Sequence, residues 1–339
     1  MRSIFKTQKL GIDLGTVNSL VCNEDKEILV QEPTVAAIME DTEEVIALGK
    51  EALNMVGKTP QNIKIVKPLF SGAIANYTIT EQMLEEFIHQ AIGKFRLFKP
   101  SVAISIPSEA TSVEYQAVLD ALKSAGAKNG YLVPEPLAAA IGAELPVFSP
   151  TGNLIVNSGG GTTEVAVVSL GGIVSSKSIR LAGNKLDNDI INYVRKKHNL
   201  IIGSITAEKI KIKIGTAKKV AESKQKQLQV KGRDTASGMP KNVIIGSNEI
   251  YEAIEKSLED LVKGIKEVLE NTSAELSSDI LDKGMVLTGG TSLLDNLDDF
   301  ITNKTGIPAV KAENSLFCVI NGLGTILKDI EYFERSLIK

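Results

Sequence analysis

The chain has 339 residues, of which 43% are hydrophobic and 23% are charged, and its formal net charge at pH 7 is -3. This composition is that of an ordinary globular protein, and the length suits two domains or two lobes that share a cleft. It excludes a disordered or repetitive chain, and the small net charge excludes the surface-wide positive field that recruits nucleic acid, so we expect no nucleic-acid partner.

The first predicted element is a strand, a tight turn and a second strand between Lys9 and Val21. The apolar run of this segment is broken by Asp13 and Gly15. A second unit of the same kind lies between Asn153 and Ser169, where a glycine-rich turn at 157–162 separates two apolar stretches. Two glycine-centred hairpins roughly 145 residues apart indicate a duplicated architecture, with one hairpin opening each lobe.

Helix and strand patterns alternate between the two hairpins. Thr78 and Glu81 have the spacing of a capping box, and apolar residues then recur at helical intervals. Further along we predict a strand at 102–106 ended by Pro107, a helix at 111–125 stopped by Gly126, a strand at 131–133 and a helix from Pro136. This alternation predicts a largely parallel sheet with helices on both faces.

The second half repeats this rhythm with one interruption. Residues 284–288 predict a strand, which is followed by Gly289, Gly290 and a helix through Leu293, Leu294 and Leu297. Residues 216–245 instead contain many lysines among glutamine, serine and glycine. We interpret that stretch as a small solvated subdomain, because charge runs usually form exposed surface.

Possible ligands for metals or disulfides are few. The chain contains two cysteines, Cys22 and Cys318, and two histidines, His89 and His198, and their spacing does not resemble a zinc site. No run approaches about 18 uninterrupted apolar residues, and residues 1–6 are too short for the apolar region of a signal peptide. We therefore expect a cytoplasmic protein.

Three glycine-bearing turns follow predicted strands, at 11–18, 157–163 and 288–292. A glycine turn lets backbone N–H groups approach phosphate oxygens closely because no side chain intervenes, and a following helix N-terminus adds favourable partial charge. A single turn of this kind is common loop punctuation. The three turns in this order predict a phosphate-binding site.

At this point the chain resembles a known family. The segments GIDLGTVNS, NMVGKTP, LFKPSVAISIP, EPLAAAIGAEL, GGGTTEVAVVSLGGIV, TAEKIKIKIG and DKGMVLTGGTSLLDNLDDFI resemble those of MreB, the bacterial actin family, in order and spacing over almost the whole chain. The resemblance implies an α/β fold of the duplicated, actin-like type, with two lobes and four subdomains around a nucleotide cleft. The implied subdomains are IA at 1–36, 71–149 and 316–339, IB at 37–70, IIA at 150–182 and 247–315, and IIB at 183–246.

The resemblance also implies ligands and roles for individual residues. The ligand would be ATP or ADP with Mg²⁺, and Asp13 and Asn157 would hold the metal through water. The nucleotide would be held by Gly15, Thr16, Val17, Asn18, Gly159, Gly160, Gly161, Glu208, Lys211, Gly289, Gly290 and Thr291. Glu208 would accept from the ribose hydroxyls, unless it is simply a solvated helix residue.

Two residues match the family's catalytic positions. Glu135 matches the catalytic glutamate, and Thr162 matches the threonine that helps to place the attacking water. Phosphoryl transfer to water depends mainly on positioning and on neutralising oxygen charge. A carboxylate beside the γ-phosphate can orient that water and accept its proton.

Two residues depart from the family pattern, because Asn157 and Asn184 stand where the family carries aspartates. The Asn157 carbonyl can still accept from a metal-bound water, but one negative charge near Mg²⁺ is missing. We therefore expect nucleotide binding with slow hydrolysis. Asn157→Asp is expected to speed phosphate release, unless the amide replaces the carboxylate without kinetic effect.

The resemblance further implies partners and a location. The two-lobed subunit would assemble head to tail into filaments, in paired protofilaments, that serve cell shape or motility beside other bacterial cytoskeletal proteins. The filament would lie on the inner face of the cell membrane, bound through Leu97 and Phe98 with Ile4 and Phe5 as a second contact. The alternative for Leu97 and Phe98 is that they close a helix onto the core.

Other functions remain as alternatives. A structural actin-like filament protein would bind nucleotide without significant hydrolysis, and only phosphate release separates it from the first hypothesis. A small-molecule kinase of the same superfamily needs an acceptor site with a catalytic base, and no such motif is found. A peptide-binding chaperone needs a further substrate domain, for which we expect no room in this chain.

Overall fold

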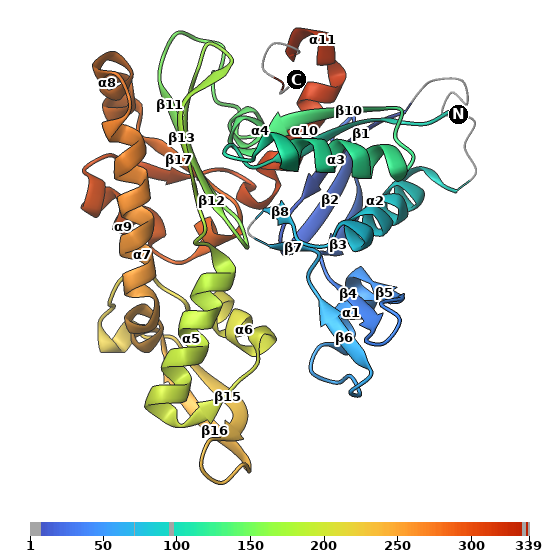
Figure 1. Ribbon diagram of the computed structural model, residues 1–339. Helices are drawn as coiled ribbons and strands as arrows, with labels where there is room; N and C mark the ends of the chain where they lie inside the picture. Colours follow the sequence, from blue (N-terminus) through green and yellow to red (C-terminus); the bar gives the residue numbers. More distant parts are fainter. Residues whose placement is uncertain (1–7, 71, 95–97, 334–336, 338–339) are drawn as a thin grey trace.

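The computed structural model describes residues 8–70, 72–94, 98–333 and 337. Within this part of the chain, two five-stranded sheets each form the centre of a lobe, and a three-stranded sheet extends from each lobe (Figure 1). We call the lobe built on β1 the first lobe and the lobe built on β11 the second lobe. Among the described residues, no helix has the length and apolar character needed to cross a membrane.

The first large sheet has the strand order β10-β9-β1-β2-β3. β1 (Lys9–Leu14) and β2 (Asn18–Asn23) form the first predicted hairpin, and β3 (Ile28–Pro33) continues it antiparallel to β2. β9 (Ser101–Ile106) pairs parallel to β1 on its other side, and β10 (Asn129–Pro134) pairs parallel to β9. The hairpin therefore lies at the centre of the sheet.

The second large sheet repeats this order as β18-β17-β11-β12-β13. β11 (Asn153–Ser158), β12 (Thr163–Ser169) and β13 (Gly172–Ile179) form its antiparallel half, and β17 (Met285–Thr288) and β18 (Ala309–Lys311) form its parallel half. The matching order confirms the predicted duplication. The prediction of a largely parallel sheet is wrong, because a short turn can join only antiparallel strands and each sheet is built on such a hairpin.

Helices cover both faces of each large sheet (Figure 1). α2 (Tyr77–Ile92) and α3 (Ser112–Ser124) pack on the outer face of the first sheet, and α7 (Ser247–Glu270) and α9 (Leu297–Thr305) pack on the outer face of the second. α4 (Glu135–Gly142) and α10 (Cys318–Lys328) lie between the two sheets. Successive strand residues alternate between these layers, as the period of a strand requires: Leu154 faces the outer core and Ile155 faces the inner one.

The two lobes are joined where α4 and α10 cross. A Cβ atom at Gly142 would lie 1.7 Å from the Cys318 carbonyl oxygen, and one at Gly322 would lie 1.9 Å from the Ala138 carbonyl oxygen. Only glycine allows backbones to approach so closely. The helices therefore touch backbone to backbone, and the contact cannot be widened or narrowed by side-chain rotation.

The predicted N-terminus of α2 is corrected by the structure. The cap is Asn76, whose side-chain oxygen accepts a hydrogen bond from the Ile79 N–H at 3.0 Å. The extended backbone that a cap requires occurs at Asn76, so Thr78 already lies inside the first helical turn. The capping-box spacing of Thr78 and Glu81 is thus coincidental.

The helix predicted through Leu293 and Leu297 is also corrected. Gly290–Leu293 form a short 3-10 helix (η2), and the chain then extends at Leu294 before α9 begins. Asn296 then adopts the left-handed conformation with a φ of 62° and forms the N-cap of α9. Apolar spacing alone did not reveal this break.

Smaller elements complete each lobe. The first lobe carries a sheet of β4 (Ala36–Met39), β5 (Val45–Leu48) and β6 (Ile63–Val66) beside α1 (Gly49–Met55), and a short hairpin of β7 (Leu69–Phe70) and β8 (Ala73–Ile74). The second lobe carries α5 (Gly183–His198), β14 (Leu200–Ile201), α6 (Ser204–Ile214), η1 (Glu222–Lys224), β15 (Gln227–Asp234), β16 (Pro240–Gly246) and α8 (Ala274–Lys283). η3 (Ser315–Phe317) precedes α10, and α11 (Ile330–Phe333) follows it. The residue boundaries of the four subdomains stay a prediction.

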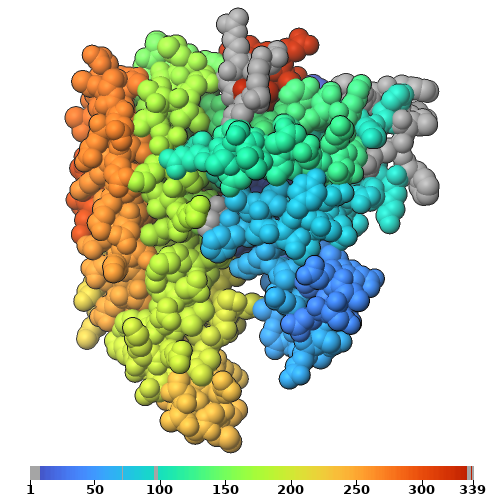
Figure 2. Space-filling view, viewed as in Figure 1, coloured from blue at the N-terminus to red at the C-terminus, as the bar shows by residue number. Residues whose placement is uncertain are grey.

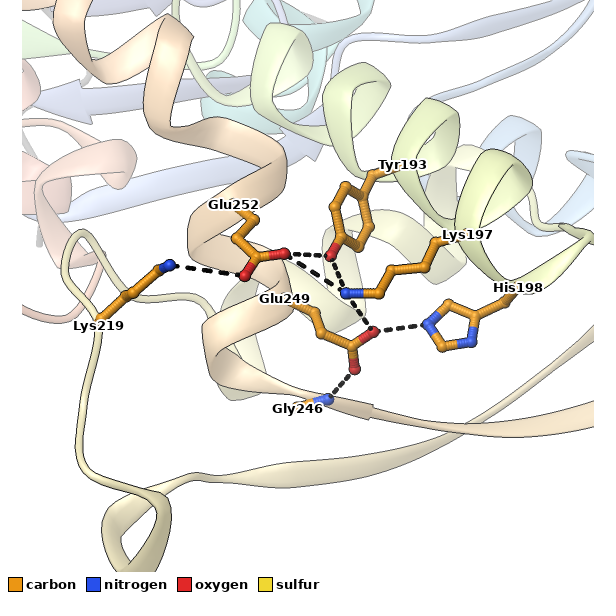
Figure 3. A network of polar contacts seen from close by, with 7 residues as sticks. All are labelled: Tyr193, Lys197, His198, Lys219, Gly246, Glu249 and Glu252. Carbon is orange, nitrogen blue, oxygen red and sulfur yellow. Dashed lines mark hydrogen bonds and ion pairs between the residues drawn. The ribbon is translucent and has the colours of Figure 1, made fainter.

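A polar network ties α5 to the start of α7 (Figure 3). Lys197 Nζ lies 3.5 Å from Glu249 Oε1 and 3.4 Å from Glu252 Oε2, and Tyr193 donates to Glu252 Oε2 at 2.7 Å. His198 Nε2 lies 2.8 Å from Glu249 Oε1. Cations at the C-terminal end of α5 thus meet carboxylates at the N-terminal end of α7, and each charge also favours its own helix dipole.

Candidate functional site

A cavity of about 480 Å³ lies between the two lobes. Figure 2 shows the lobes separated on one face by a notch between the yellow-green and blue parts of the surface. The cavity is lined by every residue predicted to hold nucleotide or metal or to catalyse, namely Asp13, Gly15, Thr16, Val17, Asn18, Glu135, Asn157, Gly159, Gly160, Gly161, Thr162, Glu208, Lys211, Gly289, Gly290 and Thr291. Residues spread over most of the chain therefore meet at one site.

The two glycine hairpins face each other at this cavity. A Cβ atom at Gly160 would lie 2.2 Å from Val17 Cγ2, and one at Gly161 would lie 2.4 Å from Thr16 Oγ1. Side chains at either position would push the turns apart, so glycine is needed here for close approach as well as for the turn. The Gly72 N–H donates to Thr16 Oγ1 at 3.2 Å and fixes the first hairpin from its other side.

The second glycine turn is held in one orientation. The Gly159 carbonyl oxygen accepts from the Gly183 N–H at 3.2 Å and from Thr291 Oγ1 at 2.8 Å, and the Gly160 carbonyl oxygen accepts from the Asn184 N–H at 2.8 Å. Because a trans peptide places C=O and N–H on opposite sides, the N–H groups of the two following residues point away from α5. Fixed N–H groups on a glycine turn suit the binding of phosphate oxygens.

Asp13 lies next to the last residue of β1, the strand that pairs with β9. Its Oδ1 accepts a hydrogen bond from Ser105 Oγ at 2.8 Å. Burial raises the pKa of Asp13 from its ordinary value of 3.8 to about 6, and the Ser105 hydrogen bond opposes that rise. A nearby cation would recover the lost solvation, so the site favours positive charge.

The donor set fits Mg²⁺ that is held mainly by water and phosphate. Mg²⁺ prefers oxygen ligands and usually keeps several of its waters, with one or two carboxylates from the protein. Among the described residues, no group of three or more His, Cys, Asp or Glu side chains could hold a metal ion. Asp13 lines the cavity and can supply one such carboxylate.

Glu135 and Asn157 are joined across the lobes. Asn157 Nδ2 donates to Glu135 Oε1 at 2.7 Å, and Asn157 Oδ1 accepts from Thr288 Oγ1 at 2.9 Å. Burial raises the pKa of Glu135 well above its ordinary value, the charges of Glu164 and Asp13 raise it further, and the Asn157 hydrogen bond opposes them. The Asn157 carbonyl, expected to face a metal-bound water, already accepts one hydrogen bond, so its predicted metal role stays a prediction.

Lys211 lies on α6 with Glu208 one turn before it, so both side chains share the face that lines the cavity. Lys211 Nζ donates to the Gly183 carbonyl oxygen at 3.0 Å and to Asp187 Oδ2 at 3.0 Å. Burial raises the pKa of Asp187 despite the nearby Lys211 charge. Lys211 thus fixes the start of α5 as well as lining the cavity.

Several lining residues were missed by the sequence prediction. Asp187 and Ser105 line the cavity as polar partners of predicted residues, and Ile212, Leu293 and Leu316 line it with large apolar side chains. Ile212 is 74% exposed, so its side chain is available for contact with an apolar part of a ligand in the cavity. No local signal marks Ser105, because its partner Asp13 lies on β1 and the sequence does not reveal that β1 pairs with β9.

The predicted membrane contact is only partly described. Phe98 is 48% exposed, so its side chain is not packed into the core as the alternative requires. Leu97, Ile4 and Phe5 lie outside the described residues.

Comparison with known proteins gives consistent relatives over the whole chain. The family model described as MreB/Mbl protein matches residues 7–335. The cell shape-determining protein Mbl of Bacillus subtilis is 42% identical over 326 residues, which are 96% of this chain and 97% of that protein. The cell shape-determining protein MreB of Escherichia coli is 44% identical over 333 residues, which are 97% of this chain and 95% of that protein.

Solved structures show the same similarity. The crystal structure of MreB5 of Spiroplasma citri bound to AMPPNP superposes with a TM-score of 0.91 at 35% identity, covering 98% of this chain and 99% of that chain. A MamK double helical filament superposes with a TM-score of 0.81 at 18% identity, covering 96% of this chain and 99% of that chain. The chain therefore has the two-lobed actin fold.

Proposed function

This chain belongs to the MreB/Mbl family, and from that premise we propose that it is an actin-like filament protein that binds ATP with Mg²⁺ between its lobes and hydrolyses it slowly. The filament would support cell shape or motility at the inner face of the cell membrane, beside other cytoskeletal proteins. The protein would then be cytoplasmic and peripheral to the membrane.

One observation carries the nucleotide proposal. Two glycine turns from the two halves of a duplicated fold face each other at one cavity, and the carboxyl groups of Asp13 and Glu135 line the same cavity. Glycine turns suit phosphate oxygens, and the apolar side chains that line the same cavity suit a base. A relative with 35% identity was crystallised with AMPPNP, which agrees with this assignment.

The residues that line the cavity would have separate roles toward the nucleotide, the metal and the attacking water. The turn at 159–161 and Thr16 would hold phosphate oxygens, and Glu208 with Lys211 would lie against the nucleoside. Asp13 would hold the metal through water, and bound Mg²⁺ would supply positive charge that neutralises phosphate oxygens. Glu135 would orient a water and accept its proton, with Thr162 beside it.

Slow hydrolysis follows from the amide at Asn157. The amide brings no negative charge to the metal, and its N–H donates to Glu135 Oε1 at 2.7 Å and so occupies one oxygen of the proposed base. We therefore expect a weak ATPase.

Assembly follows from the shape of the subunit. The two ends of the molecule differ, with α11 near one end and the two small sheets at the other (Figure 1). Unlike surfaces that bind each other give open, head-to-tail filaments. The MamK relative of similar fold is itself a double helical filament, and paired protofilaments are proposed here as well.

Sedimentation and phosphate release together test this proposal. Purified protein should pellet in Mg-ATP, show filaments by electron microscopy, and release phosphate more slowly than it assembles. A protein that stays monomeric at every concentration and nucleotide state would contradict the filament assignment.

The alternative is a structural filament protein without significant hydrolysis. The hydrogen bond from Asn157 to Glu135 favours it, because that bond restricts the one carboxylate proposed as the base. Filaments that form in Mg-ATP with no phosphate release would select this alternative.

The membrane proposal rests on Phe98, which is exposed beside Lys99. Inserting a large apolar side chain gains about 1.5 to 3 kcal/mol, and a filament multiplies weak contacts by multivalency. Phe98→Ser should therefore reduce co-sedimentation of filaments with anionic liposomes. Phe70→Ser is the matched control, because Phe70 is 70% exposed elsewhere in the first lobe; equal loss in both variants would reject Phe98 as an anchor.

A further inference from the structure

A row of polar side chains crosses the second large sheet. Thr288 pairs with Asn157, Asn157 pairs with Glu164, and Glu164 pairs with Ser178, on the strands β17, β11, β12 and β13. Residues directly opposite each other on neighbouring strands point to the same face of a sheet. The four side chains therefore form one continuous row.

This row contacts the first lobe at two neighbouring points. Asn157 donates to Glu135 at the start of α4, and Glu164 Oε2 accepts from the Ser108 N–H at 3.0 Å and from Ser108 Oγ at 2.7 Å. Glu135 comes directly after β10, and Ser108 comes two residues after the end of β9; β9 and β10 are parallel neighbours. The two contacts therefore both lie at the carboxyl-terminal ends of strands in the first large sheet.

Glu164 is a fully buried carboxylate that the proposed reaction does not use. Its Oε1 accepts from Ser178 Oγ in its own lobe, while its Oε2 accepts from Ser108 in the other. It does not line the nucleotide cavity, so contact with a ligand does not explain it. A buried charge is costly unless it is fully hydrogen-bonded, and only a carboxylate can accept from donors on both oxygens.

The turn that Glu164 holds leads directly to the cavity. Pro107, the residue before Ser108, lines the cavity, and so does Ser105, which donates to Asp13. The residue two before Glu164 is Thr162, which lines the cavity from the second lobe. Hydrogen bonds at Glu164 therefore lie between two cavity-lining segments that belong to different lobes.

We propose that Glu164 is a positioning residue, an interlobe clamp that holds the turn after β9 against β12 and so fixes the placement of Glu135 relative to Thr162. The inference rests on the proposed hydrolysis only for its catalytic consequence. The clamp itself is a property of the folded chain.

Amide hydrogen exchange on the full-length protein without nucleotide tests the clamp directly. Glu164→Gln keeps the shape but leaves one oxygen as acceptor, so the Ser108 amide should exchange about tenfold faster, as the loss of a charge-assisted hydrogen bond predicts. Ser178→Ala is the matched control, because it removes a hydrogen bond to Glu164 within the second lobe only. It should leave exchange at Ser108 within about twofold of wild type.

The kinetic constants of phosphate release separate positioning from mere structural support. Glu164→Gln should lower kcat about tenfold with the KM for Mg-ATP nearly unchanged, because it shifts Glu135 relative to Thr162 without touching the nucleotide cavity. Ser178→Ala keeps the contact with Ser108 and should keep both constants. A variant that was only less stable would show the wild-type kcat once the rate is divided by the concentration of folded protein.

Unchanged Ser108 exchange in Glu164→Gln, at a melting temperature equal to wild type, overturns the clamp. If Glu164→Gln does not fold, Glu164→Asp takes its place, because the charge remains while the shorter side chain cannot reach both serines, and unchanged exchange there overturns the clamp as well. If wild type releases no phosphate, the proposed hydrolysis fails while the exchange experiment still decides the clamp.

Discussion

The two glycine hairpins are built alike and differ in one functional group. In the first lobe, Asp13 Oδ1 accepts from Ser105 Oγ on the neighbouring parallel strand at 2.8 Å. In the second lobe, Asn157 Oδ1 accepts from Thr288 Oγ1 on its own neighbouring parallel strand at 2.9 Å. The remaining oxygen of Asp13 brings negative charge to the site, whereas the remaining group of Asn157 is a donor that binds Glu135.

This difference shows how a duplicated fold can keep a hydrogen bond and change the chemistry beside it. A hydroxyl donor on the adjacent strand orients either a carboxylate or an amide equally well. The charge, by contrast, decides whether the side chain favours a cation or a neighbouring carboxylate. The first hairpin is thus suited to a metal and the second to Glu135.

The largest effect on phosphate release is expected at Glu135, which accepts a hydrogen bond from Asn157 of the second hairpin. Glu135→Ala removes the proposed base and should slow phosphate release by about 10² to 10⁴, the usual contribution of a general base. ATP binding, followed with a fluorescent nucleotide, should remain. If release were unchanged, Glu135 would not be the base and the pairing with Asn157 would have only a structural role.

Giving the second hairpin the carboxylate of the first should speed phosphate release instead of slowing it. Asn157→Asp restores a negative charge near the metal, and a gain of about 1.4 to 3 kcal/mol in transition-state stabilisation would speed phosphate release about ten- to a hundredfold at saturating Mg-ATP. Without nucleotide the same variant should melt at a lower temperature, because a carboxylate would replace the N–H that now lies 2.7 Å from Glu135 Oε1. A lower melting temperature with unchanged release would show that the missing charge does not limit hydrolysis.

Making the first hairpin like the second tests the metal role of Asp13. Asp13→Asn should weaken Mg-ATP binding about tenfold, because charge-assisted hydrogen bonds to metal-bound water are replaced by neutral ones. Titration calorimetry in Mg²⁺ measures this loss, and the affinity for nucleotide in EDTA should not change. Equal losses with and without Mg²⁺ would mean that Asp13 acts on the fold and not on the metal.

The same variant should stabilise the protein without nucleotide. The pKa of Asp13 is raised in the folded state from 3.8 to about 6, so the folded protein binds a proton more tightly than the unfolded chain does. The free energy of unfolding therefore falls as pH rises from about 3.8 to about 6. The total loss is up to about 3 kcal/mol, and it persists at neutral pH. Glu135 and Glu164 also have raised pKa values, so the difference in melting temperature between Asp13→Asn and wild type, followed from pH 4 to 7, isolates Asp13.

The smallest effect concerns the contact between the two turns. Gly160→Ala would place a methyl group 2.2 Å from Val17 Cγ2, so the free energy of unfolding should fall by about 1 kcal/mol or more. Gly159→Ala is the control, because its nearest neighbour would be 3.6 Å away. Val17→Ala should restore part of the stability of Gly160→Ala if the two hairpins do press on each other.

Much of the fold could be predicted from local patterns. Glycine-centred hairpins at 9–21 and 153–169 indicated the duplication, since turn residues between apolar runs are a local signal. The parallel or antiparallel pairing of each strand could not be predicted, because it depends on contacts between distant strands such as β1 and β9. The cap at Asn76 and the break at Asn296 were missed because apolar spacing does not report backbone conformation.

The site could be predicted where a family motif carries it and not beyond. Asp13, Glu135 and the glycine turns lie in such motifs and meet at one cavity. Ser105, Asp187 and Glu164 carry no local signal, because each matters through a partner more than 20 residues away, namely Asp13, Lys211 and Ser108. A buried charge such as Glu164 also reads in a sequence as an ordinary solvated strand residue.

The crossing of α4 and α10 determines where motion between the lobes can be seen. Gly142 and Gly322 let the two backbones touch, so the axis of a rotation of one lobe against the other would pass near this contact. Displacement grows with distance from a rotation axis, and the hairpin β15–β16 and the sheet β4–β6 lie far from the crossing (Figure 1). Spectroscopic labels on these two tips would therefore record cleft opening as a large change, while the hydrogen bond between Glu135 and Asn157, at the first turn of α4, would change least.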